Sequence, residues 1–351
     1  MIPLFKPYMP ELPEVESILH SGSLAYGNYT KAFEDKLRQY FKTEYLLATN
    51  SFNSAITLAV NCLGLNNSDE VILSPLACLA STQAYLTSGL KLRWADIDPY
   101  RGTLDPDSVK KNINKRTKCI IHYHFCGYPG YINEINTIGK EYGIPVIDDG
   151  LECFGSEYQN KKIGNCDSDV TIFSLSSVRL VNTIDGGCII FSNKHQYEKA
   201  VLARDCGIRR SMFRKANGEI DINCDINSTG LSATMSNFNG YIGLCQMDKI
   251  TCLIEKQRKQ ALKWKQEIGK CGKCIPIQSV DMNPNYWVFG ILVDDKEKAF
   301  AHFNEKGYVV SSVHVDNSKY SIFKNYCSLP GVQTFSSRFL ALPCGWWMDK
   351  D

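Results

Sequence analysis

The chain has 351 residues, of which 44% are hydrophobic and 22% charged, so it is long enough to bury a large core. Its 39 basic and 37 acidic residues leave a net charge of +2, which gives no electrostatic reason to expect nucleic acid or a membrane surface as a partner. With scattered cysteines, no signal peptide and no apolar run of membrane-spanning length, we expect reduced thiols in a cytoplasmic protein.

Short apolar segments alternate with amphipathic ones through the first 150 residues. Strands of four to six apolar residues that alternate with helices are typical of a mainly parallel sheet covered on both faces. Ligands of such sheets bind beyond the carboxyl ends of the strands. The expected strands are residues 45–48, 70–73, 92–95, 119–122 and 145–148, and the expected helices are residues 30–42, 54–63, 80–88, 106–112 and 131–142.

The pattern changes near residue 240. A long charged helix is predicted from Cys245 to about residue 268, followed by a mixed segment with strands near 286–293 and 308–314. We expect residues 1–240 to form a large α/β domain that includes an N-terminal arm. Residues 241–351 are expected to form the long helix and a smaller C-terminal α+β domain.

Residues 173–191 resemble a strand, a polar turn, a tight Asp185-Gly186-Gly187 bend and a second strand. Together with Val146-Ile-Asp-Asp149 and His124-Phe-Cys-Gly-Tyr-Pro129, this segment resembles the DegT/StrS-type sugar aminotransferases. These proteins are a branch of the aspartate-aminotransferase-like, fold-type-I pyridoxal phosphate (PLP) superfamily. The resemblance covers nearly the whole chain. It implies an α/β fold with a mainly parallel seven-stranded sheet, helices on both faces and a smaller C-terminal α+β domain.

The resemblance places Arg179 at the position of the family's catalytic lysine, six residues before the acidic-Gly-Gly turn. In the family this lysine forms the Schiff base with PLP, but here no lysine lies between Lys162 and Lys194. A guanidinium stays protonated and is not an amine nucleophile, so Arg179 can neither form the aldimine nor act as the usual proton shuttle. Two interpretations stay open: Arg179 binds a phosphate or carboxylate, or it pairs with a nearby acid and fills the space that the cofactor left.

Some of the family's other cofactor-binding residues have matching residues in this chain, and some do not. Asp149 matches the family's acid that holds the pyridine nitrogen protonated, although a carboxylate at a strand end also caps turns. Ser174 matches a hydroxyl that contacts the phosphate. In the phosphate loop Phe52 stands in the glycine's place and Asn53 in the threonine's, while Asn53 and Ser54 can still cap the following helix and hold an anion.

Three further positions depart from the family pattern. Cys78 stands where an aromatic ring stacks on the pyridine, and Ser232 replaces an asparagine that the dimer partner supplies. Glu152 stands where His or Gln contacts the ring hydroxyl, and a carboxylate there would repel a phenolate oxygen. All six departures fall on positions that contact PLP in the family. We therefore expect that the chain has lost ordinary transamination and no longer binds PLP. The alternative is that pyridoxamine phosphate (PMP) or PLP still binds. The departures are Phe52, Asn53, Cys78, Glu152, Arg179 and Ser232.

The sequence also offers two candidate sites of other kinds. His124 matches the family's His-x-x-Gly element, whose role is largely structural, and a catalytic role for His124 is the less favoured interpretation. Cys271 and Cys274 form the one close cysteine pair, but no second pair supplies the other ligands, so we expect no metal site.

The resemblance implies a nucleotide-linked sugar as ligand, in a pathway that makes deoxy or amino sugars for surface polysaccharide such as lipopolysaccharide. It also implies a homodimer with shared active sites. Our leading hypothesis is a diverged member that binds or modifies a nucleotide sugar without a Schiff base. Two alternatives stay open: a PMP- or PLP-dependent enzyme acting on a keto sugar, such as a dehydratase, and a non-catalytic partner of an active paralogue.

Overall fold

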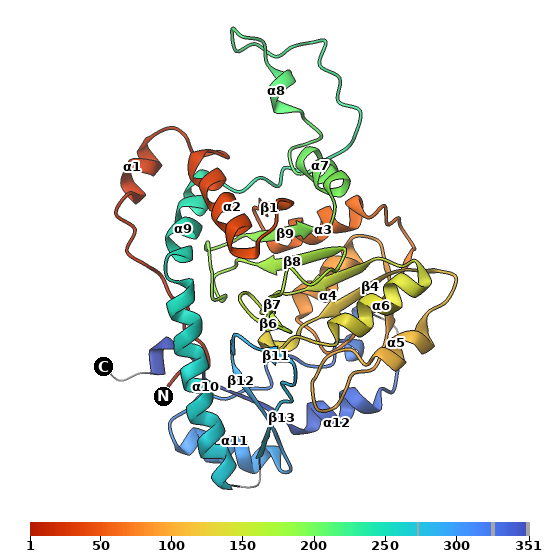
Figure 1. Cartoon of the computed structure of the whole chain (residues 1–351), viewed down its shortest axis with the longest axis vertical. Coiled ribbons are helices and arrows are strands. Elements are labelled where there is room, and N and C mark those ends of the chain that lie inside the picture. Colours follow the sequence, from red (N-terminus) through yellow and green to blue (C-terminus); the bar gives the residue numbers. More distant parts are fainter. Residues whose placement is uncertain (272–273, 324–326, 349–351) are drawn as a thin grey trace.

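The computed structural model describes residues 1–271, 274–323 and 327–348. Its centre is a seven-stranded sheet in the order β1-β9-β8-β5-β4-β2-β3 (Figure 1). β9 is antiparallel to both neighbours, and every other strand runs in one direction, so the predicted mainly parallel sheet is confirmed. The strands are β1 Leu46–Thr49, β2 Glu70–Leu73, β3 Lys91–Trp94, β4 Thr117–Tyr123, β5 Val146–Asp149, β8 Val170–Ser174 and β9 Gly187–Phe191.

Helices cover both faces of this sheet, as predicted. Successive side chains of a strand point to opposite faces, so neighbouring residues enter different cores. Val71 and Ile147 pack in the core that contains α3 and α4, whereas Ile72 and Val146 pack with α5 and α6. The helices of this part are α1 Val15–His20, α2 Asn28–Phe41, α3 Phe52–Cys62, α4 Leu79–Thr87, α5 Pro106–Asn112, α6 Ile132–Tyr142, α7 Lys194–Ala203 and α8 Arg210–Phe213.

The C-terminal part adds helices and the small antiparallel sheet β10-β12-β13. Its strand β11 also pairs with β6 of the preceding part, in a second small antiparallel sheet of order β11-β6-β7. The helices of the described residues are too short or too polar to span a bilayer. The division into domains at residue 240 stays a prediction. The strands are β6 Glu157–Tyr158, β7 Lys161–Lys162, β10 Cys274–Pro276, β11 Met282–Asn283, β12 Phe289–Val293 and β13 Phe339–Leu342. The helices are α9 Asn237–Met247, α10 Ile250–Cys271, α11 Lys296–Glu305 and α12 Pro330–Arg338, with 3-10 turns η1 Phe125–Gly127, η2 Asn317–Lys319, η3 Ser321–Phe323 and η4 Trp346–Met348.

The predicted long charged helix is present as α10, but it begins at Ile250 and not at Cys245, which lies in the preceding helix α9. The structure has α9 and α10 in succession, with a break after Met247. At the break the Lys249 amide bonds the carbonyl of Gln246, three residues back, at 3.0 Å. This tighter turn interrupts the α-helical ladder, and no proline or glycine marks it in the sequence.

The predicted strand at 308–314 was wrong. This segment makes only isolated bridges, between Tyr308 and Ile2 and between Ser311 and Ala341. Val313 has a positive φ of 59°, which extended strand backbone does not allow. The other predicted strand, 286–293, is shortened to β12, because Tyr286 has a φ of 53°.

A buried ion pair joins α2 to the segment after α7. Arg204 donates from Nη1 to Glu34 Oε1 and, at 2.7 Å, to the carbonyl of Ala48 in β1. Glu34 also accepts from the Ala48 amide at 2.8 Å and from the Tyr26 hydroxyl at 2.7 Å. Both charged side chains are less than one-tenth exposed, so each depends on the other for its charge.

Glu34→Ala should lower the free energy of unfolding by about 3–5 kcal/mol, because it leaves the Arg204 charge buried without its partner. Urea denaturation measures this loss. The matched control is Asp248→Ala, which breaks the exposed Lys36–Asp248 pair and should change stability by less than about 1 kcal/mol. Equal effects of the two variants would contradict the assignment.

Candidate active site

Two predicted site residues, Asp149 and Ser174, lie at the carboxyl edge of the large sheet. Thr49 at the end of β1 and Ser174 at the end of β8 both lie opposite Gly187 on β9. Asp149, at the end of β5, pairs with Ile172 on β8. The helix α3 begins three residues after Thr49, so its N-terminus lies at the same edge. This is where an open α/β sheet binds its ligands.

The first turn of α3 is polar, but its cap differs from the prediction. Ser51, and neither Asn53 nor Ser54, is the N-cap: its hydroxyl accepts from the Ser54 amide at 3.1 Å. The Ser54 hydroxyl donates to Asn50 Oδ1 at 2.7 Å, and Asn53 is exposed. The Phe52 ring is buried in the core, so it leaves the polar first turn uncovered.

Asp149 is fully buried at the end of β5. Its carboxylate accepts from the Ser81 hydroxyl and, at 3.2 Å, from the Leu151 amide. Burial raises the pKa of Asp149 to about 6, although both hydrogen bonds act in the opposite direction. A carboxyl group with a raised pKa at the mouth of a parallel sheet is typical of a functional site.

Glu152 is the most heavily hydrogen-bonded acid at this edge. Oε1 accepts from Arg179 Nη1 at 3.2 Å and from His314 Nε2 at 2.9 Å. Oε2 accepts from the Tyr123 hydroxyl at 2.8 Å and from the Cys126 amide at 2.9 Å. Burial acts to raise the pKa of Glu152, but His314, Arg179 and Tyr123 together lower it, so the group is ionised. Its acceptor sites are filled by protein donors.

Arg179 lies in the loop between β8 and β9, and its guanidinium is buried beside Glu152. It also lies over the ring of Trp287, 5.1 Å from the centroid, and Phe5 of the N-terminal segment stacks on that ring at 5.4 Å. The Nε–H of Arg179 is buried without a hydrogen-bond partner among the described residues. Burial and the Glu152 charge raise the pKa of the Cys78 thiol, while the nearby Arg179 opposes this shift.

The remaining predicted residues lie around this group. The Ser174 hydroxyl donates to Ser176 Oγ at 3.1 Å. The Ser232 carbonyl accepts from the side chain of Asn50 at 3.0 Å, which brings Ser232 to the start of α3 within one chain. The functional roles of Asn53, Ser54, Cys78, Ser174 and Ser232 stay predictions.

His124 belongs to a separate buried cluster. Its Nδ1 accepts from the Gly130 amide at 3.1 Å, its Nε2 lies 3.5 Å from Asp148, and its ring contacts that of His122. Although burial acts to raise it, the pKa of Asp148 is held below its ordinary range by the two histidines. Among the described residues His124 has no recorded bond to Glu152 or Arg179, and its catalytic role stays a prediction.

Sequence reasoning missed His314, Tyr123 and Trp287. Tyr123 and Trp287 were missed because large aromatic residues in apolar segments are usually core residues. His314 stood in a segment predicted to be a strand, and nothing in the sequence indicates that the turn at Val313 directs it to Glu152. A lone histidine after an apolar run was the only available signal.

Within the part of the chain that the structure describes, two groups of side chains come close enough to one another to suggest metal ligands: His122, His124 and Asp148, and Cys126, Glu152 and His314. In the first group, the Gly130 amide donates to His124 Nδ1, so Nε2 carries the hydrogen and offers no lone pair. In the second, the Arg179 guanidinium already neutralises Glu152 and would repel a cation. Neither group fits an ion well. Of the Cys271–Cys274 segment, residues 272–273 lie outside the described residues.

The residues fit PLP only in part. Asp149 suits the pyridine nitrogen, and the first turn of α3 with Ser174 suits a phosphate. No lysine in residues 162–194 is placed to react with the PLP aldehyde. Residues 163–193 contain no lysine. The amine of Lys162 lies over the Tyr40 ring, and that of Lys194 is paired with Glu198. This segment therefore offers no lysine for covalent attachment of PLP.

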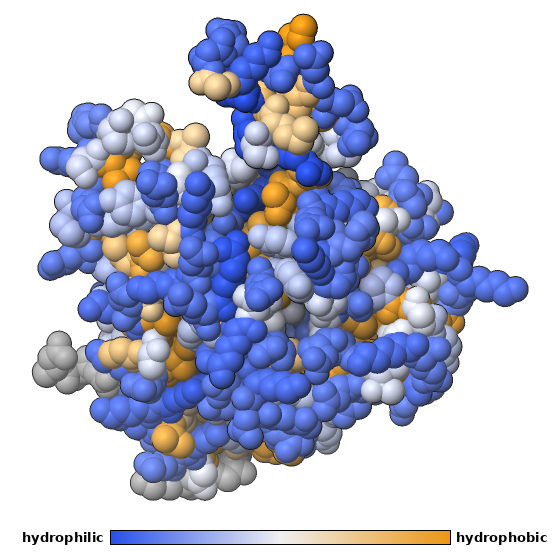
Figure 2. Space-filling view, turned by 45° about the horizontal axis from the view of Figure 1, so that its top comes forward, coloured by the Kyte–Doolittle hydropathy of each residue, from blue (hydrophilic) through white to orange (hydrophobic). Residues whose placement is uncertain are grey.

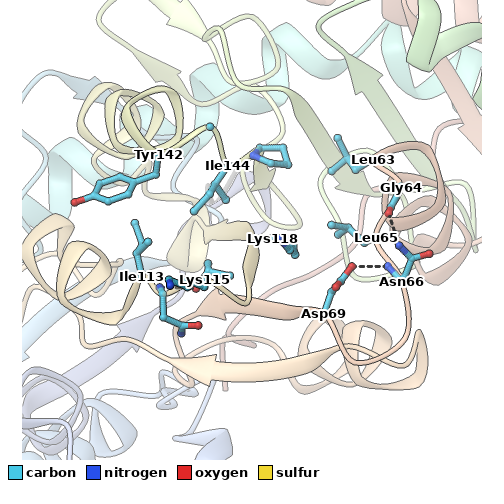
Figure 3. Close-up of a pocket in the computed structure, with 14 residues that line it drawn as sticks. Leu63, Gly64, Leu65, Asn66, Asp69, Ile113, Lys115, Lys118, Tyr142 and Ile144 are labelled. Atoms are coloured by element: carbon cyan, nitrogen blue, oxygen red, sulfur yellow. Dashed lines mark hydrogen bonds between the residues drawn. The ribbon is translucent and has the colours of Figure 1, made fainter.

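A cavity of about 720 Å³ lies at the other edge of the sheet (Figure 3). Asp69, Thr117 and Pro145, at the amino ends of β2, β4 and β5, line it. The Asp69 carboxylate in this cavity is already engaged locally, since it accepts from the Asn66 amide at 2.7 Å. None of the predicted site residues lines this cavity, so the chemistry is assigned to the carboxyl edge.

The raised pKa of Asp149 predicts a pH-dependent stability. The folded protein binds this proton more tightly than the unfolded chain, so the stabilisation is complete below about pH 4 and is lost as the pH rises through about 6. The difference in unfolding free energy between wild type and Asp149→Asn should therefore change by about 3 kcal/mol between about pH 4 and pH 7. Urea denaturation across this range measures it. Asp167→Asn, at an exposed carboxylate, is the control; an Asp149→Asn difference that is flat with pH would contradict the assignment.

Comparison with known proteins agrees with this geometry. GDP-perosamine synthase from Escherichia coli O157:H7 is 26% identical over 311 residues, which are 87% of this chain and 82% of that protein. The solved structure of the sugar aminotransferase CalS13 from Micromonospora echinospora is 23% identical with a TM-score of 0.92, covering 100% of this chain and 96% of that one. A Bacillus subtilis protein solved with bound PMP is 23% identical with a TM-score of 0.82, covering 97% and 81%. The predicted aspartate-aminotransferase-like fold is confirmed. The model of the DegT/DnrJ/EryC1/StrS aminotransferase family matches residues 9–351, and the chain belongs to this family.

Proposed function

We propose that this chain binds a nucleotide-linked sugar at the carboxyl edge of the large sheet and acts on it without a Schiff base. The observation that carries the proposal is the buried guanidinium of Arg179, ion-paired with Glu152 at 3.2 Å. A guanidinium cannot form the imine on which transamination depends. The nucleotide-linked sugar, and a role in making deoxy or amino sugars for surface polysaccharide, are suggested by relatives such as GDP-perosamine synthase.

The similarities alone do not argue for a loss of transamination. A structural relative was solved with PMP, and here Asp149, Ser174 and the first turn of α3 offer partners for the ring nitrogen and phosphate. PMP or PLP held without a covalent bond is therefore the second candidate. Retention of PMP or PLP by the purified protein distinguishes this second candidate from action without the cofactor.

The purified protein should retain no stoichiometric cofactor after incubation with PLP or PMP and desalting. Absorbance between about 320 and 420 nm, where the cofactor absorbs, measures retention, and borohydride reduction followed by mass spectrometry detects an imine. Arg179→Lys is the matched variant, and we expect it also to fail, because Cys78 and Glu152 still depart from the family pattern. Stoichiometric cofactor on the wild-type protein would overturn the proposal. Retention by Arg179→Lys alone would assign the loss to residue 179.

The second measurement is ligand binding. Calorimetric titration with UDP-, GDP- and dTDP-linked sugars should show binding that is specific for one nucleotide, and free monosaccharide should bind far more weakly. Absence of binding to every nucleotide sugar would remove the proposed ligand class and leave a non-catalytic partner as the better reading of the chain.

We further propose a cytoplasmic homodimer. A loop that includes α8, residues 207–230, projects from the body of the molecule (Figure 1) and carries apolar side chains among hydrophilic ones (Figure 2). Ile222 on this loop is 88% exposed, and a second subunit would cover such an apolar residue. The exposed apolar residues of the loop are Met212, Ile220, Ile222 and Ile226.

Sedimentation should show a dimer for the wild-type protein and a weakened dimer for Ile222→Asp, because a charge in an apolar interface is costly. Leu262→Asp, on an exposed position of α10, is the control and should leave the dimer intact. A monomeric wild-type protein at micromolar concentration would exclude the homodimer.

A further inference from the structure

His314 and Glu152 are arranged as a base with an orienting acid. The distance from His314 Nε2 to Glu152 Oε1 is 2.9 Å, and Nε2 also lies 3.1 Å from the Tyr123 hydroxyl. Glu152 is ionised and accepts only, and Tyr123 donates its own hydrogen to Glu152, so His314 must carry its hydrogen on Nε2. In neutral His314, Nδ1 therefore holds a free lone pair. Among the described residues, the hydrogen bonds of the His314 ring are made by Nε2 and none by Nδ1.

The position of His314 is fixed by strained backbone. Val313 has a φ of 59°, which a β-branched residue adopts at a cost, and the His314 amide bonds the Ser312 carbonyl at 2.6 Å to close a tight turn. The turn is held because Asn317 donates to the Ala77 carbonyl at 2.9 Å. The His314 side chain is 12% exposed, whereas the Glu152 side chain is fully buried. Of the two residues, His314 is therefore the one that a ligand can reach from solvent.

A donor for negative charge lies beside this base. Arg179 Nη1 and His314 Nε2 bond the same oxygen of Glu152, at 3.2 and 2.9 Å, so the guanidinium and the imidazole are neighbours. The Nε–H of Arg179 is buried and unpartnered, and buried donors of this kind have a ligand or water as partner when the site is filled. A base beside a cationic donor is what removal of a proton next to a carbonyl group requires, because charge moves from the carbon to the carbonyl oxygen.

We propose that His314 is the catalytic base, and Glu152 its positioning residue, in cofactor-free proton transfer at the carbon beside the carbonyl of a nucleotide-linked keto sugar. This inference rests on the proposed function. The C–H bond breaks, the proton goes to Nδ1, and the electron pair forms the C=C bond of an enolate whose oxygen is held by Arg179. Return of the proton to the same carbon gives exchange or epimerisation. Where that carbon carries a hydroxyl group, the hydroxyl proton passes to the enolate oxygen, the carbon-bound proton returns to the former carbonyl carbon, and the carbonyl group has moved by one carbon. No oxidant or reductant is consumed.

The test is hydrogen exchange in D₂O. The full-length protein is incubated with nucleoside-diphosphate 4-keto sugars, and proton NMR and mass spectrometry follow deuterium uptake at the carbons beside the carbonyl. Wild type should accelerate exchange well above the rate without protein. His314→Asn should lower kcat for exchange by about 10²–10⁴-fold, the usual contribution of a positioned base, with KM nearly unchanged. His195→Asn, at an exposed residue of α7, is the matched control and should exchange like wild type.

The double variant separates a positioning role from a structural one. If Glu152 acts through His314, then Glu152→Gln lowers kcat without changing KM, and His314→Asn with Glu152→Gln is no slower than His314→Asn alone. Additive losses would overturn the positioning role. Thermal melting checks that each variant is folded. Because the His314 side chain is partly exposed, we expect His314→Asn to fold, and its exchange rate tests the base even if Glu152→Gln unfolds.

The outcomes also separate this inference from the proposed function. Binding of a nucleotide sugar without wild-type exchange, or equal exchange by His314→Asn and wild type, overturns the inference and leaves the proposed function standing. Absence of both binding and exchange overturns both.

Discussion

A single buried carboxylate joins the parts of the candidate site. Glu152 accepts hydrogen bonds from Tyr123 in β4, from Cys126 in the turn that follows, from Arg179 and from His314. These donors come from segments up to 191 residues apart in the chain, so the acid fixes the C-terminal part on the large sheet. A buried charge is tolerated only when it is paired and hydrogen-bonded, and here both conditions are met.

This pairing changes the meaning of two departures from the family pattern that the resemblance predicts. Taken separately, Arg179 and Glu152 look like two losses of cofactor contacts. In the structure they are one ion pair, and either residue alone would leave an uncompensated charge in a buried position. The two changes are therefore physically coupled, and the charge of the site is balanced without a ligand. Since protein donors fill the acceptor sites of Glu152, this carboxylate affects a ligand only by positioning residues such as Arg179 and His314.

The sequence predicted the large sheet well because short apolar strands, alternating with helices, leave few other arrangements. The family resemblance assigned Asp149, Ser174 and Arg179 to one site, and Asp149 and Ser174 do lie at the carboxyl edge, where the ends of parallel strands converge. Sequence reasoning missed the break between α9 and α10 and the turn at Val313, which depend on tertiary contacts and on backbone angles that no residue type signals. The Ser51 cap was missed for a simpler reason, because Ser51, Asn53 and Ser54 are all good caps and only the position of the first turn distinguishes them.

The first turn of α4 connects the two acid sites. Ser81 donates to Asp149, and one turn of backbone away the Ala77 carbonyl accepts from Asn317, which holds the turn that presents His314. The strained φ of Val313 costs about 1–3 kcal/mol, and such strain persists only where surrounding contacts over-determine it. Here the contacts come from the helix that also positions Asp149. Since Ser81 and Thr82 of α4 bond Asp149 and Asn317, a shift of α4 would disturb both the buried acid and the turn that presents the partly exposed His314.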